Sequence, residues 1–468
     1  MIIEQIYTGC LAQGAYYIES NGEVAIIDPL REVQDYIDRA ATKNAKIKYI
    51  FETHFHADFV SGHVTLAEKT GAKIVFGPTA KTDFEAVIAE DNQVFKVGDI
   101  TITVLHTPGH TMESSCYLLK DKNGKNHALF SGDTLFLGDV GRPDLAQKGD
   151  VTEEDLAGFL FDSLRNKVMV LEDEVIVYPA HGAGSACGKN LSKETVGTIG
   201  NQKETNYALR ADMTKEEFIK EVTEGLLPPP AYFPLNVKLN KEGYTSVDEV
   251  IERSAKPLSV QDFEMIANET DALILDVRHQ DVFIKGFIPQ SIFIGIDGGF
   301  APWVGALIKD ITQPLLLVTP EGKEEDTITR LSRVGFDNVL GYLEGSFTSW
   351  ENAGKEIDTL TSISAEVLEE KMKETIPVFD VRKPGEFSSG HIKVAESTPL
   401  DFLNTHIAEF PKKEKFYVHC AGGYRSVIAA SILKARGFHN VVDVAGGYAA
   451  IKNTGIEKTA EVCPSTLK

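Results

Sequence analysis

The sequence predicts an α/β protein of several domains, and three observations lead to this fold class. The chain has 468 residues, which is too long for one hydrophobic core and corresponds to about three domains. Its first half alternates short apolar runs with Gly- and Asp-rich turns, as α/β proteins do. Its second half contains a unit of about 100 residues that occurs twice, which indicates two small domains rather than a solenoid.

Residues 1–225 contain short apolar runs that are typical of strands, and several of these runs end directly in His or Asp. The runs are residues 23–28, 46–54, 72–77, 100–107, 127–133 and 174–181. Capping boxes predict two helices, one from Thr152 with Asp155 and one from Thr214 with Glu217. Because chemistry in α/β folds gathers where strands end in polar loops, we expect the functional site at these strand ends.

Residues 228–240, PPPAYFPLNVKLN, are predicted to be a linker or a wrapping arm, because three consecutive prolines cannot continue a helix. Two matching units follow. The repeat consists of Asp276, Arg278, Phe283 and Gly286, which match Asp380, Arg382, Phe387 and Gly390. Each unit reads as strand, turn, helix and strand, so we expect two small α/β domains with mostly parallel sheets. The predicted domain boundaries are 1–240, 257–356 and 362–463.

The composition narrows the classes of partner. A net charge of −22 disfavours nucleic acid and anionic membranes. No stretch reaches the roughly 18 apolar residues of a membrane helix, and the N-terminus, which contains Glu4, lacks a signal-peptide pattern. The five scattered cysteines form a poor disulfide framework. We therefore expect a cytoplasmic protein, and the sequence leaves a homo-oligomer open.

Metal-ligating side chains occur in several of the loops that follow the predicted strands. These loops are THFHADF (53–59) with His54, His56 and Asp58, TPGHT (107–111) with His110, SGDTLF (131–136) with Asp133, and YPAHG (178–182) with His181. A single His or Asp at a strand end is usually a hydrogen-bonding or capping residue. Together, at successive strand ends, these residues are hard to explain without a metal ion.

The four segments together resemble the metallo-β-lactamase superfamily, over about the first 225 residues. The resemblance implies an αββα sandwich with metal at one edge, and its members use two zinc ions for hydrolysis or one iron ion for oxidation. Two-metal members carry a histidine ligand at the position of Phe59, so the second metal would lack a ligand here. The remaining His54, His110 and Asp133 suit one Fe(II) ion with positions open for O2.

The sequence is specifically similar to the persulfide dioxygenases of this superfamily. The similarity implies mononuclear non-haem Fe(II) bound by the three residues just named. It also implies that His56, Asp58 and His181 surround them, with Asp58 orienting a ligand imidazole and His181 hydrogen-bonding a molecule at the metal. The segment GDTLFLGDVGRPDLAQKG (132–149) resembles the family's substrate loop, in which Arg142 would face the thiol carrier of the substrate. A salt bridge to Asp144 is the alternative for Arg142.

The segment HGAGSACG (181–188) departs from the glutathione-using members of the family. In those members the histidine is followed by Asp-Tyr, and the tyrosine contacts glutathione. Here Cys187 lies nearby instead, so it is a candidate substrate contact, with packing in a small-residue loop as the alternative. The carrier of the persulfide therefore stays open among glutathione, coenzyme A, bacillithiol, cysteine and free sulfide chains.

The segment FYVHCAGGYRS (416–426) leads from an apolar strand through Cys420 into a loop that closes on Arg425, where a helix begins. Glycines allow backbone amides to converge, and the helix N-terminus and the guanidinium add positive charge, so the loop stabilises a thiolate or a bound anion. We expect Cys420 and Arg425 to be catalytic. The residues expected to contact the substrate there are Ala421, Gly422, Gly423 and Tyr424.

Residues 362–463 resemble a rhodanese domain through DVR (380–382), GHI (390–392), the cysteine loop and GG (446–447). The resemblance implies that Cys420 carries a persulfide sulfur. A cysteine phosphatase or an arsenate reductase is the rival interpretation, but phosphatase-type loops are longer. In the middle unit, VTPEGKEED (318–326) places Pro320 at the cysteine position and Glu325 at the arginine position, so we expect that unit to be non-catalytic.

These features predict a persulfide dioxygenase coupled to a sulfurtransferase, and the domain order resembles bacterial fusions of sulfide detoxification. The predicted partners are a small persulfide, O2, sulfite and thiosulfate. One alternative is a glyoxalase II-like zinc thioester hydrolase with a fused sulfur-carrier rhodanese. Another is a sulfur carrier or sensor whose metal is structural. Cys10, Cys116 and Cys463 show no reactive context.

Overall fold

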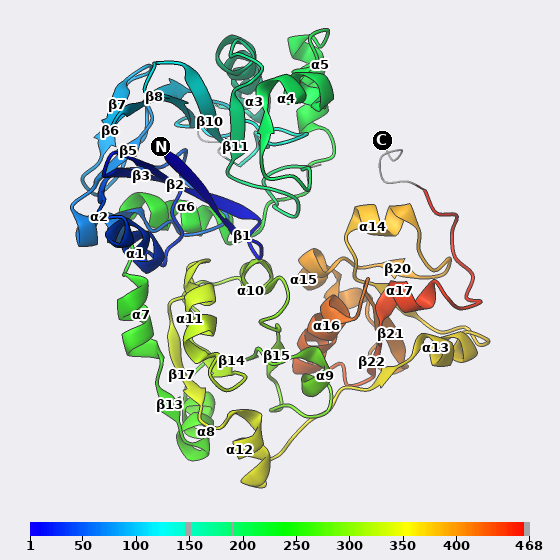
Figure 1. The fold of residues 1–468 in the computed structure, drawn as a ribbon. Helices are drawn as coiled ribbons and strands as arrows, with labels where there is room; N and C mark the ends of the chain where they lie inside the picture. Colours follow the sequence, from blue (N-terminus) through cyan, green and yellow to red (C-terminus); the bar gives the residue numbers. More distant parts are fainter. Residues whose placement is uncertain (146–150, 190, 463–468) are drawn as a thin grey trace. The chain divides into compact units, whose positions relative to one another are not determined.

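The computed structural model describes residues 1–145, 151–189 and 191–462. Cys463 and positions 146–149 of the predicted substrate loop lie outside the described residues. The chain folds as two compact units, which are residues 1–250 with 332–335 and residues 251–331 with 336–468 (Figure 1). Among the described residues, no helix is both long and apolar enough to cross a membrane.

Two six-stranded sheets form the centre of the first unit, and each follows the order of the chain. The first sheet contains β1 (Ile2–Thr8), β2 (Gln13–Ser20), β3 (Glu23–Ile27), β4 (Lys46–Phe51), β5 (Lys73–Phe76) and β6 (Val87–Ile88). The second contains β7 (Val94–Val97), β8 (Ile100–His106), β9 (Ser115–Lys120), β10 (Asn126–Gly132), β11 (Ile176–Pro179) and β12 (Gly197–Thr198). Strands β3 to β6 are parallel, as are β10 and β11, and the other neighbours are antiparallel.

Helices cover the outer faces of both sheets (Figure 1). They are α1 (Gln34–Thr42), α2 (His63–Thr70), α3 (Glu153–Ser163), a π-helical turn (Leu164–Val168), α4 (Ile199–Thr205), a 3-10 turn (Tyr207–Leu209), α5 (Lys215–Thr223) and α6 (Phe233–Glu242). Helix α7 (Val247–Ser254) contains the boundary between the two units. Phe51 and Tyr117 belong to the core between the sheets. Leu66 packs α2 against the first sheet, and Leu160 and Phe218 pack α3 and α5 against the second. This layering confirms the predicted αββα sandwich.

Local sequence signals account for most of these elements. Thr152 with Asp155 caps α3, and Thr214 with Glu217 caps α5, as the sequence predicts. The predicted strands correspond to β3, β4, β5, β8, β10 and β11, with ends that differ by up to three residues. The linker prediction is wrong in part, because helix α6 begins at residue 233 inside it. Pro234 is tolerated there, since the first helical residues lack an internal partner for their N–H groups in any case.

The second unit contains two copies of one five-stranded, fully parallel sheet. The spatial order in the middle copy (residues 257–356) is β13 (Pro257–Leu258), β17 (Val339–Leu343), β16 (Leu315–Val318), β14 (Leu273–Asp276) and β15 (Ile292–Phe293). In the C-terminal copy (residues 362–462) it is β18 (Ser362–Ile363), β22 (Val441–Val444), β21 (Phe416–His419), β19 (Val378–Asp380) and β20 (Glu396–Ser397). The identical order confirms the predicted repeat.

The helices of the second unit follow the same repeat (Figure 1). The middle copy contains α8 (Val260–Glu269), α9 (Gln280–Phe283), α10 (Phe300–Leu307), α11 (Glu324–Ser332) and α12 (Ser346–Asn352). The C-terminal copy contains α13 (Ala365–Lys371), α14 (Pro384–Ser389), α15 (Leu403–His406) between 3-10 turns Leu400–Phe402 and Ile407–Glu409, α16 (Tyr424–Ala435) and α17 (Gly447–Ile451).

The matched DVR motifs form the same buried ion pair in both copies. Arg278 donates from Nη2 to Asp276 at 2.6 Å and to the carbonyl of Gly286 at 2.8 Å. The C-terminal copy repeats these bonds, with the same distances, from Arg382 to Asp380 and to the Gly390 carbonyl. Because these groups satisfy one another, the motif supports the fold and leaves the chemistry to other loops.

Asp443, on β22, gives the C-terminal copy a pH-dependent stability. Burial raises the pKa of Asp443 to about 6 from an ordinary value of 3.8. Folding therefore favours the protonated acid, so the stability falls as the pH rises from about 4 to about 6 and is constant above that. We expect Asp443→Asn, which keeps the bond from Ser362, to stabilise the protein at pH 8 by up to about 3 kcal/mol.

At pH 4, where Asp443 is protonated in the folded state but only about half ionised in the unfolded state, the same substitution should stabilise the protein far less than at pH 8. Thermal unfolding at pH 4 and pH 8 measures both values. Asp271→Asn, at an exposed position of the second unit, is the control. An equal effect of Asp443→Asn at the two pH values would show that the charge of this carboxyl is not the cause.

Candidate metal centre and cysteine loop

The ends of three strands in the first unit bring His54, His110 and Asp133 together, and we call these residues the metal-donor group. His54 lies in the loop after β4, His110 in the loop after β8, and Asp133 directly follows β10. Nε2 of His110 lies 3.4 Å from Oδ2 of Asp133, and Nε2 of His54 lies 3.8 Å from it. All three side chains are buried.

Hydrogen bonds fix the orientation of both imidazoles of the metal-donor group. His54 donates from Nδ1 to Oγ1 of Thr53 at 3.0 Å, and His110 donates from Nδ1 to the carbonyl of Arg142 at 2.8 Å. Each Nε2 atom is thereby left with a lone pair. Oδ2 of Asp133 has no hydrogen-bond partner within the described part of the chain. Three buried acceptors that meet without a donor fit a cation between them.

His56 contacts two buried carboxylates that the sequence prediction missed. Its Nε2 lies 3.0 Å from Oδ1 of Asp28 and 3.4 Å from Oε2 of Glu52. Asp28 also accepts bonds from N and Oγ1 of Thr53, so it holds the start of the THFHADF segment. Burial, with the charge of Asp28, raises the pKa of Glu52 well above its ordinary value. The available signal was weak: Asp28 ends a predicted strand, and Glu52 lies two residues before His54.

A second donor group, formed by Asp58, His181 and Cys187, is also buried, and its ligand atoms lie within 4.8 Å of one another. His181 donates from Nδ1 to Oδ1 of Asp133 at 2.8 Å, and its Nε2 lies 2.9 Å from Oδ2 of Asp58. Burial lowers the pKa of His181, but the two carboxylates outweigh it and raise that pKa well above its ordinary value. Asp58, predicted to orient a ligand imidazole, therefore contacts His181 instead.

Cys187 lies in this buried site, with its sulfur within 4.8 Å of a ligand atom of Asp58 and of His181. Burial and the carboxylates of Asp58 and Asp133 raise the pKa of the Cys187 thiol well above its ordinary value, so the free thiol is protonated. Phe59 is fully buried and offers no ligand atom. We expected a second metal site to lack a ligand, because Phe59 replaces a histidine there. The structure amends this expectation, since Cys187 supplies a third donor atom.

Arg142 adopts the predicted alternative, a salt bridge to Asp144. Its guanidinium donates to both carboxylate oxygens of Asp144 at 2.6 Å, and to the carbonyls of Leu227 at 2.5 Å and Ala186 at 3.3 Å. These bonds occupy the guanidinium, which is 7% exposed. The backbone of Arg142 contributes to the site instead, since its carbonyl accepts the bond from His110.

Helix α6, inside the predicted linker, supports the THFHADF segment. Asn240 donates from Nδ2 to the carbonyls of His56 at 2.8 Å and Phe59 at 2.9 Å. Its Oδ1 accepts the N–H of Ser61 at 2.9 Å. One buried amide therefore holds three backbone groups in the second half of the loop that carries the first metal donor, in agreement with the wrapping-arm interpretation. No local signal in the sequence marks Asn240 for this role.

The cysteine loop (residues 420–425) lies between β21 and α16 of the C-terminal copy. The N–H of Gly423 donates to Sγ of Cys420 at 3.1 Å, and Gly423 has φ 104, a conformation that favours glycine. Arg425 forms two bonds to Glu386, at 2.6 and 2.8 Å. The amide of Gly423 thus faces the sulfur, as predicted, whereas the guanidinium is held by the carboxylate of Glu386, which no sequence pattern marks.

The remaining predicted loop residues have different surroundings. The carbonyl of Ala421 accepts the N–H of Ala449 at 2.9 Å, which joins the loop to α17. Gly422 is exposed. Tyr424 begins α16 and directs its hydroxyl to the middle copy.

The structure shifts the predicted correspondence in the middle copy by one residue. Strand β16 pairs with β14 in the register in which β21 pairs with β19. The residue that follows β16 is Thr319, and the residue that follows β21 is Cys420. Thr319, rather than Pro320, therefore occupies the cysteine position. The same shift moves the arginine position from Glu325 to Glu324.

Glu324 fills the anion position of the middle copy. Its Oε1 accepts the N–H of Gly322 at 3.2 Å and Oγ1 of Thr319 at 3.3 Å. Gly322 corresponds to Gly423, so the amide that faces a sulfur in the C-terminal copy faces a carboxylate here. The middle copy has neither the thiol nor a free anion site in this loop, which supports its predicted non-catalytic role.

Comparison with known proteins identifies the same parts of the chain. Residues 8–181 match the metallo-beta-lactamase superfamily, and residues 259–353 and 364–454 match the rhodanese-like domain. A hydroxyacylglutathione hydrolase from Polaromonas sp. is 33% identical over 190 residues, which are 39% of this chain and 66% of that protein. A probable hydroxyacylglutathione hydrolase from Schizosaccharomyces pombe is 31% identical over 161 residues, 34% of this chain and 58% of that protein. The matched region thus spans about three fifths of these relatives.

Two solved structures also resemble this chain. A metallo-beta-lactamase from Staphylococcus aureus is 30% identical with a TM-score of 0.65, and the match covers 73% of this chain and 98% of that chain. ETHE1 from Myxococcus xanthus is 29% identical with a TM-score of 0.44, and the match covers 52% of this chain and 98% of that chain.

Proposed function

The chain belongs to the metallo-β-lactamase superfamily and carries two rhodanese-like domains, and on that premise we propose an iron-dependent persulfide dioxygenase coupled to a sulfurtransferase. The presence of the metal-donor group and the cysteine loop on one chain is the observation that carries the proposal. One site would oxidise sulfane sulfur and the other would transfer it, so both would use one substrate class. We assign the three domains to residues 1–240, 257–356 and 362–463.

His54 and His110 would hold the metal through Nε2, and Asp133 would hold it through Oδ2. Two imidazoles and one carboxylate leave further coordination positions open, which suits Fe(II) and O2. Bound there, Fe(II) supplies the oxidation of persulfide sulfur by O2. The net reaction converts R–S–SH, O2 and H2O to R–SH, sulfite and two protons. The outer sulfur loses four electrons, and O2 gains them.

The surrounding side chains would orient this site and exclude water. His181 donates to Oδ1 of Asp133, which leaves Oδ2 for the metal. His56 and Asp58 are each held against buried charged groups, so neither is free to move into the substrate position. We assign Cys187 to contact with the persulfide. Since these side chains are all buried, the sulfur would react away from bulk water.

Cys420 would accept and release sulfane sulfur. Its thiolate attacks the outer sulfur of a persulfide, the donor S–S bond breaks, and the carrier thiolate leaves with the electron pair. The sulfur lone pair of sulfite then attacks the outer sulfur of the Cys420 persulfide, which releases thiosulfate and restores the thiolate. The N–H of Gly423 and the N-terminus of α16 would stabilise the anionic sulfur. The reverse sequence would make persulfide from thiosulfate and a thiol.

The substrate class is a low-molecular-weight persulfide carried by glutathione, coenzyme A, bacillithiol or cysteine. The absence of a tyrosine shortly after His181 argues against glutathione. We propose a cytoplasmic reaction, because the free cysteines Cys10, Cys116, Cys187 and Cys420 suit a reducing compartment.

A zinc thioester hydrolase of the glyoxalase II type is the second candidate. The names of the curated relatives favour it, and the second donor group offers three ligand atoms beside the first. Phe59 at a ligand position of two-metal members and the cysteine loop both favour the dioxygenase.

Metal analysis with an oxygen electrode separates the two candidates. We expect about one iron ion per chain, and O2 consumption that depends on an added persulfide. Cys187→Ser should retain the iron, because Cys187 is not assigned to the metal-donor group. Two zinc ions per chain, one of them lost in Cys187→Ser, together with hydrolysis of a glutathione thioester under anaerobic conditions, would establish the hydrolase instead.

A further inference from the structure

The middle copy binds the side chain of Tyr424, a residue of the cysteine loop in the C-terminal copy. Tyr424 donates from its hydroxyl to the carbonyl of Gly295 at 2.7 Å. Its ring meets the ring of Phe293 edge-on, with centroids 5.9 Å apart. A Cβ atom added to Gly298 would lie 2.3 Å from the Tyr424 ring. The ring therefore lies directly against the backbone of residues 295–298.

The segment that receives Tyr424 is itself held in place by the middle copy. The N–H of Ile296 donates to the carbonyl of Val277 at 3.0 Å. The carbonyl of Ile296 accepts a bond from Nη1 of Arg330 at 2.9 Å, and Arg330 is paired with Asp326 on α11. A receptor with few alternative positions can restrict the motion of the side chain that it holds.

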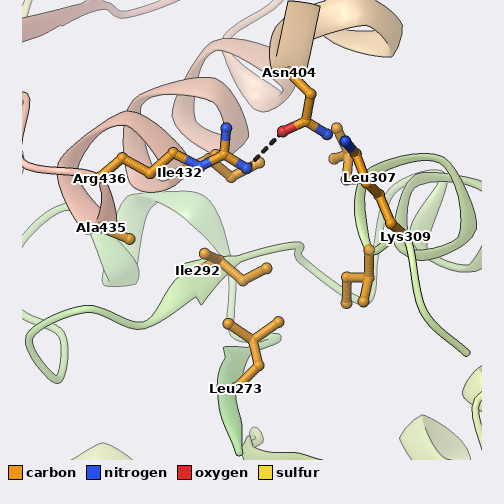
Figure 2. Close-up of a pocket in the computed structure, with 9 residues that line it drawn as sticks. Leu273, Ile292, Leu307, Lys309, Asn404, Ile432, Ala435 and Arg436 are labelled. Carbon is orange, nitrogen blue, oxygen red and sulfur yellow. Dashed lines mark hydrogen bonds between the residues drawn. The ribbon is translucent and has the colours of Figure 1, made fainter. Parts of the chain in front are cut away.

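The contact between the copies continues along α16, whose first residue is Tyr424. Ser431 accepts the N–H of Phe293 at 2.9 Å, and both residues are buried. At the far end of the helix, Figure 2 shows Ile432 and Ala435 of α16 opposite Ile292 of β15, around a pocket of about 430 Å³. Strand β15 thus contacts the first residue of α16 and the C-terminal part of the helix.

We propose that the middle copy, which has Thr319 at the cysteine position, positions the cysteine loop of the C-terminal copy through Tyr424. Tyr424 lies between Gly423, whose N–H faces Sγ of Cys420, and Arg425, which binds Glu386. Fixing the Tyr424 ring fixes the turn that directs this amide at the sulfur. Tyr424 is therefore a positioning residue, and Gly298 is small because the ring occupies the space of its side chain. That this positioning serves sulfur transfer rests on the proposed function. The positioning of the cysteine loop by the middle copy does not depend on that function.

Alkylation of Cys420 by iodoacetamide, followed at a series of pH values by mass spectrometry of the Cys420 peptide, tests the positioning. Tyr424→Phe removes the bond to Gly295, and we expect alkylation at neutral pH to slow by about threefold to tenfold. Gly298→Ala displaces the ring, and we expect a slowing of about tenfold or more. In both variants the pH profile should move to higher pH, because the thiolate loses the aligned amide of Gly423.

Gly299→Ala is the matched control, one residue along the same segment. Its added Cβ would lie 3.4 Å from Trp303, an ordinary contact, and it should leave the alkylation profile unchanged. Gly298→Ala combined with Tyr424→Ala should be no worse than Tyr424→Ala alone, because the added methyl group then meets no ring. Additive effects in this double variant, or an unchanged pH profile in both Gly298→Ala and Tyr424→Phe, would overturn the proposal.

Sulfur transfer from thiosulfate, measured on the same proteins, separates this proposal from the proposed function. A wild-type protein without transfer activity, but with the coupled alkylation pattern, would overturn the transferase and support the positioning. Active sulfur transfer in the wild-type protein, with no coupling between substitutions at residues 298 and 424, would support the transferase and overturn the positioning.

Discussion

Cys420→Ser is expected to lower sulfur transfer by at least about a thousandfold and to leave O2 uptake at the metal-donor group unchanged. A serine hydroxyl fits the same cradle of amides, but it is not a thiolate and cannot carry a sulfane sulfur as a persulfide. The measurement is the ratio of sulfite to thiosulfate formed from a persulfide and O2. We expect sulfite to accumulate in the variant.

Cys116→Ser is the matched control for this experiment. Cys116 is fully buried, and burial raises the pKa of its thiol to about 11, so it is an unreactive cysteine of the first unit. An unchanged sulfite-to-thiosulfate ratio in Cys420→Ser would contradict the coupled reaction. Residual transfer that disappears only when Cys187→Ser is added would assign the transfer to Cys187.

His110→Ala is expected to remove most of the bound metal and to lower O2 uptake by at least about a hundredfold, since even changes to residues around a metal's ligands cost tenfold to a hundredfold. The substitution removes one of the three atoms that face one another in the metal-donor group. Metal analysis and an oxygen electrode measure both effects. Sulfur transfer from thiosulfate at Cys420 should continue.

His106→Ala is the control for His110→Ala. His106 ends β8, four residues before His110, and its Nε2 contacts the carbonyl of Met112 at 2.9 Å rather than a member of the metal-donor group. We expect the control to retain its metal. A His110→Ala protein that keeps the wild-type metal content would show that the donor assignment is wrong.

The parts of the fold that could be predicted from sequence depend on neighbours in the chain. Thr152 and Asp155 are three residues apart, and their capping box begins the predicted helix. The Asp380 and Arg382 pair is two residues apart, so its repetition in the middle copy was visible directly. The cysteine loop could be predicted for the same reason, because its thiol, the amide that faces the thiol and the start of the helix all lie within residues 420–424.

Contacts between distant segments could not be predicted in this way. Asn240 holds a loop about 180 residues earlier, through a helix inside a segment that reads as a linker. The sequence around Arg142 was compatible with contact to the substrate and with a salt bridge to Asp144, because the sequence does not show the direction of the side chain. Thr319 was missed since neither it nor Pro320 is a cysteine, so only the strand register distinguishes them.

Because the carboxylate of Glu324 fills the anion position, no single substitution gives the middle copy the cysteine loop of the C-terminal copy. Thr319→Cys alone would create a thiol beside a carboxylate, and that charge disfavours the thiolate. Replacing Glu324 by arginine alone would place a cation in a loop that has no thiolate for the cation to stabilise. Both substitutions would therefore be needed together before this loop of the middle copy could hold a thiolate beside a cation.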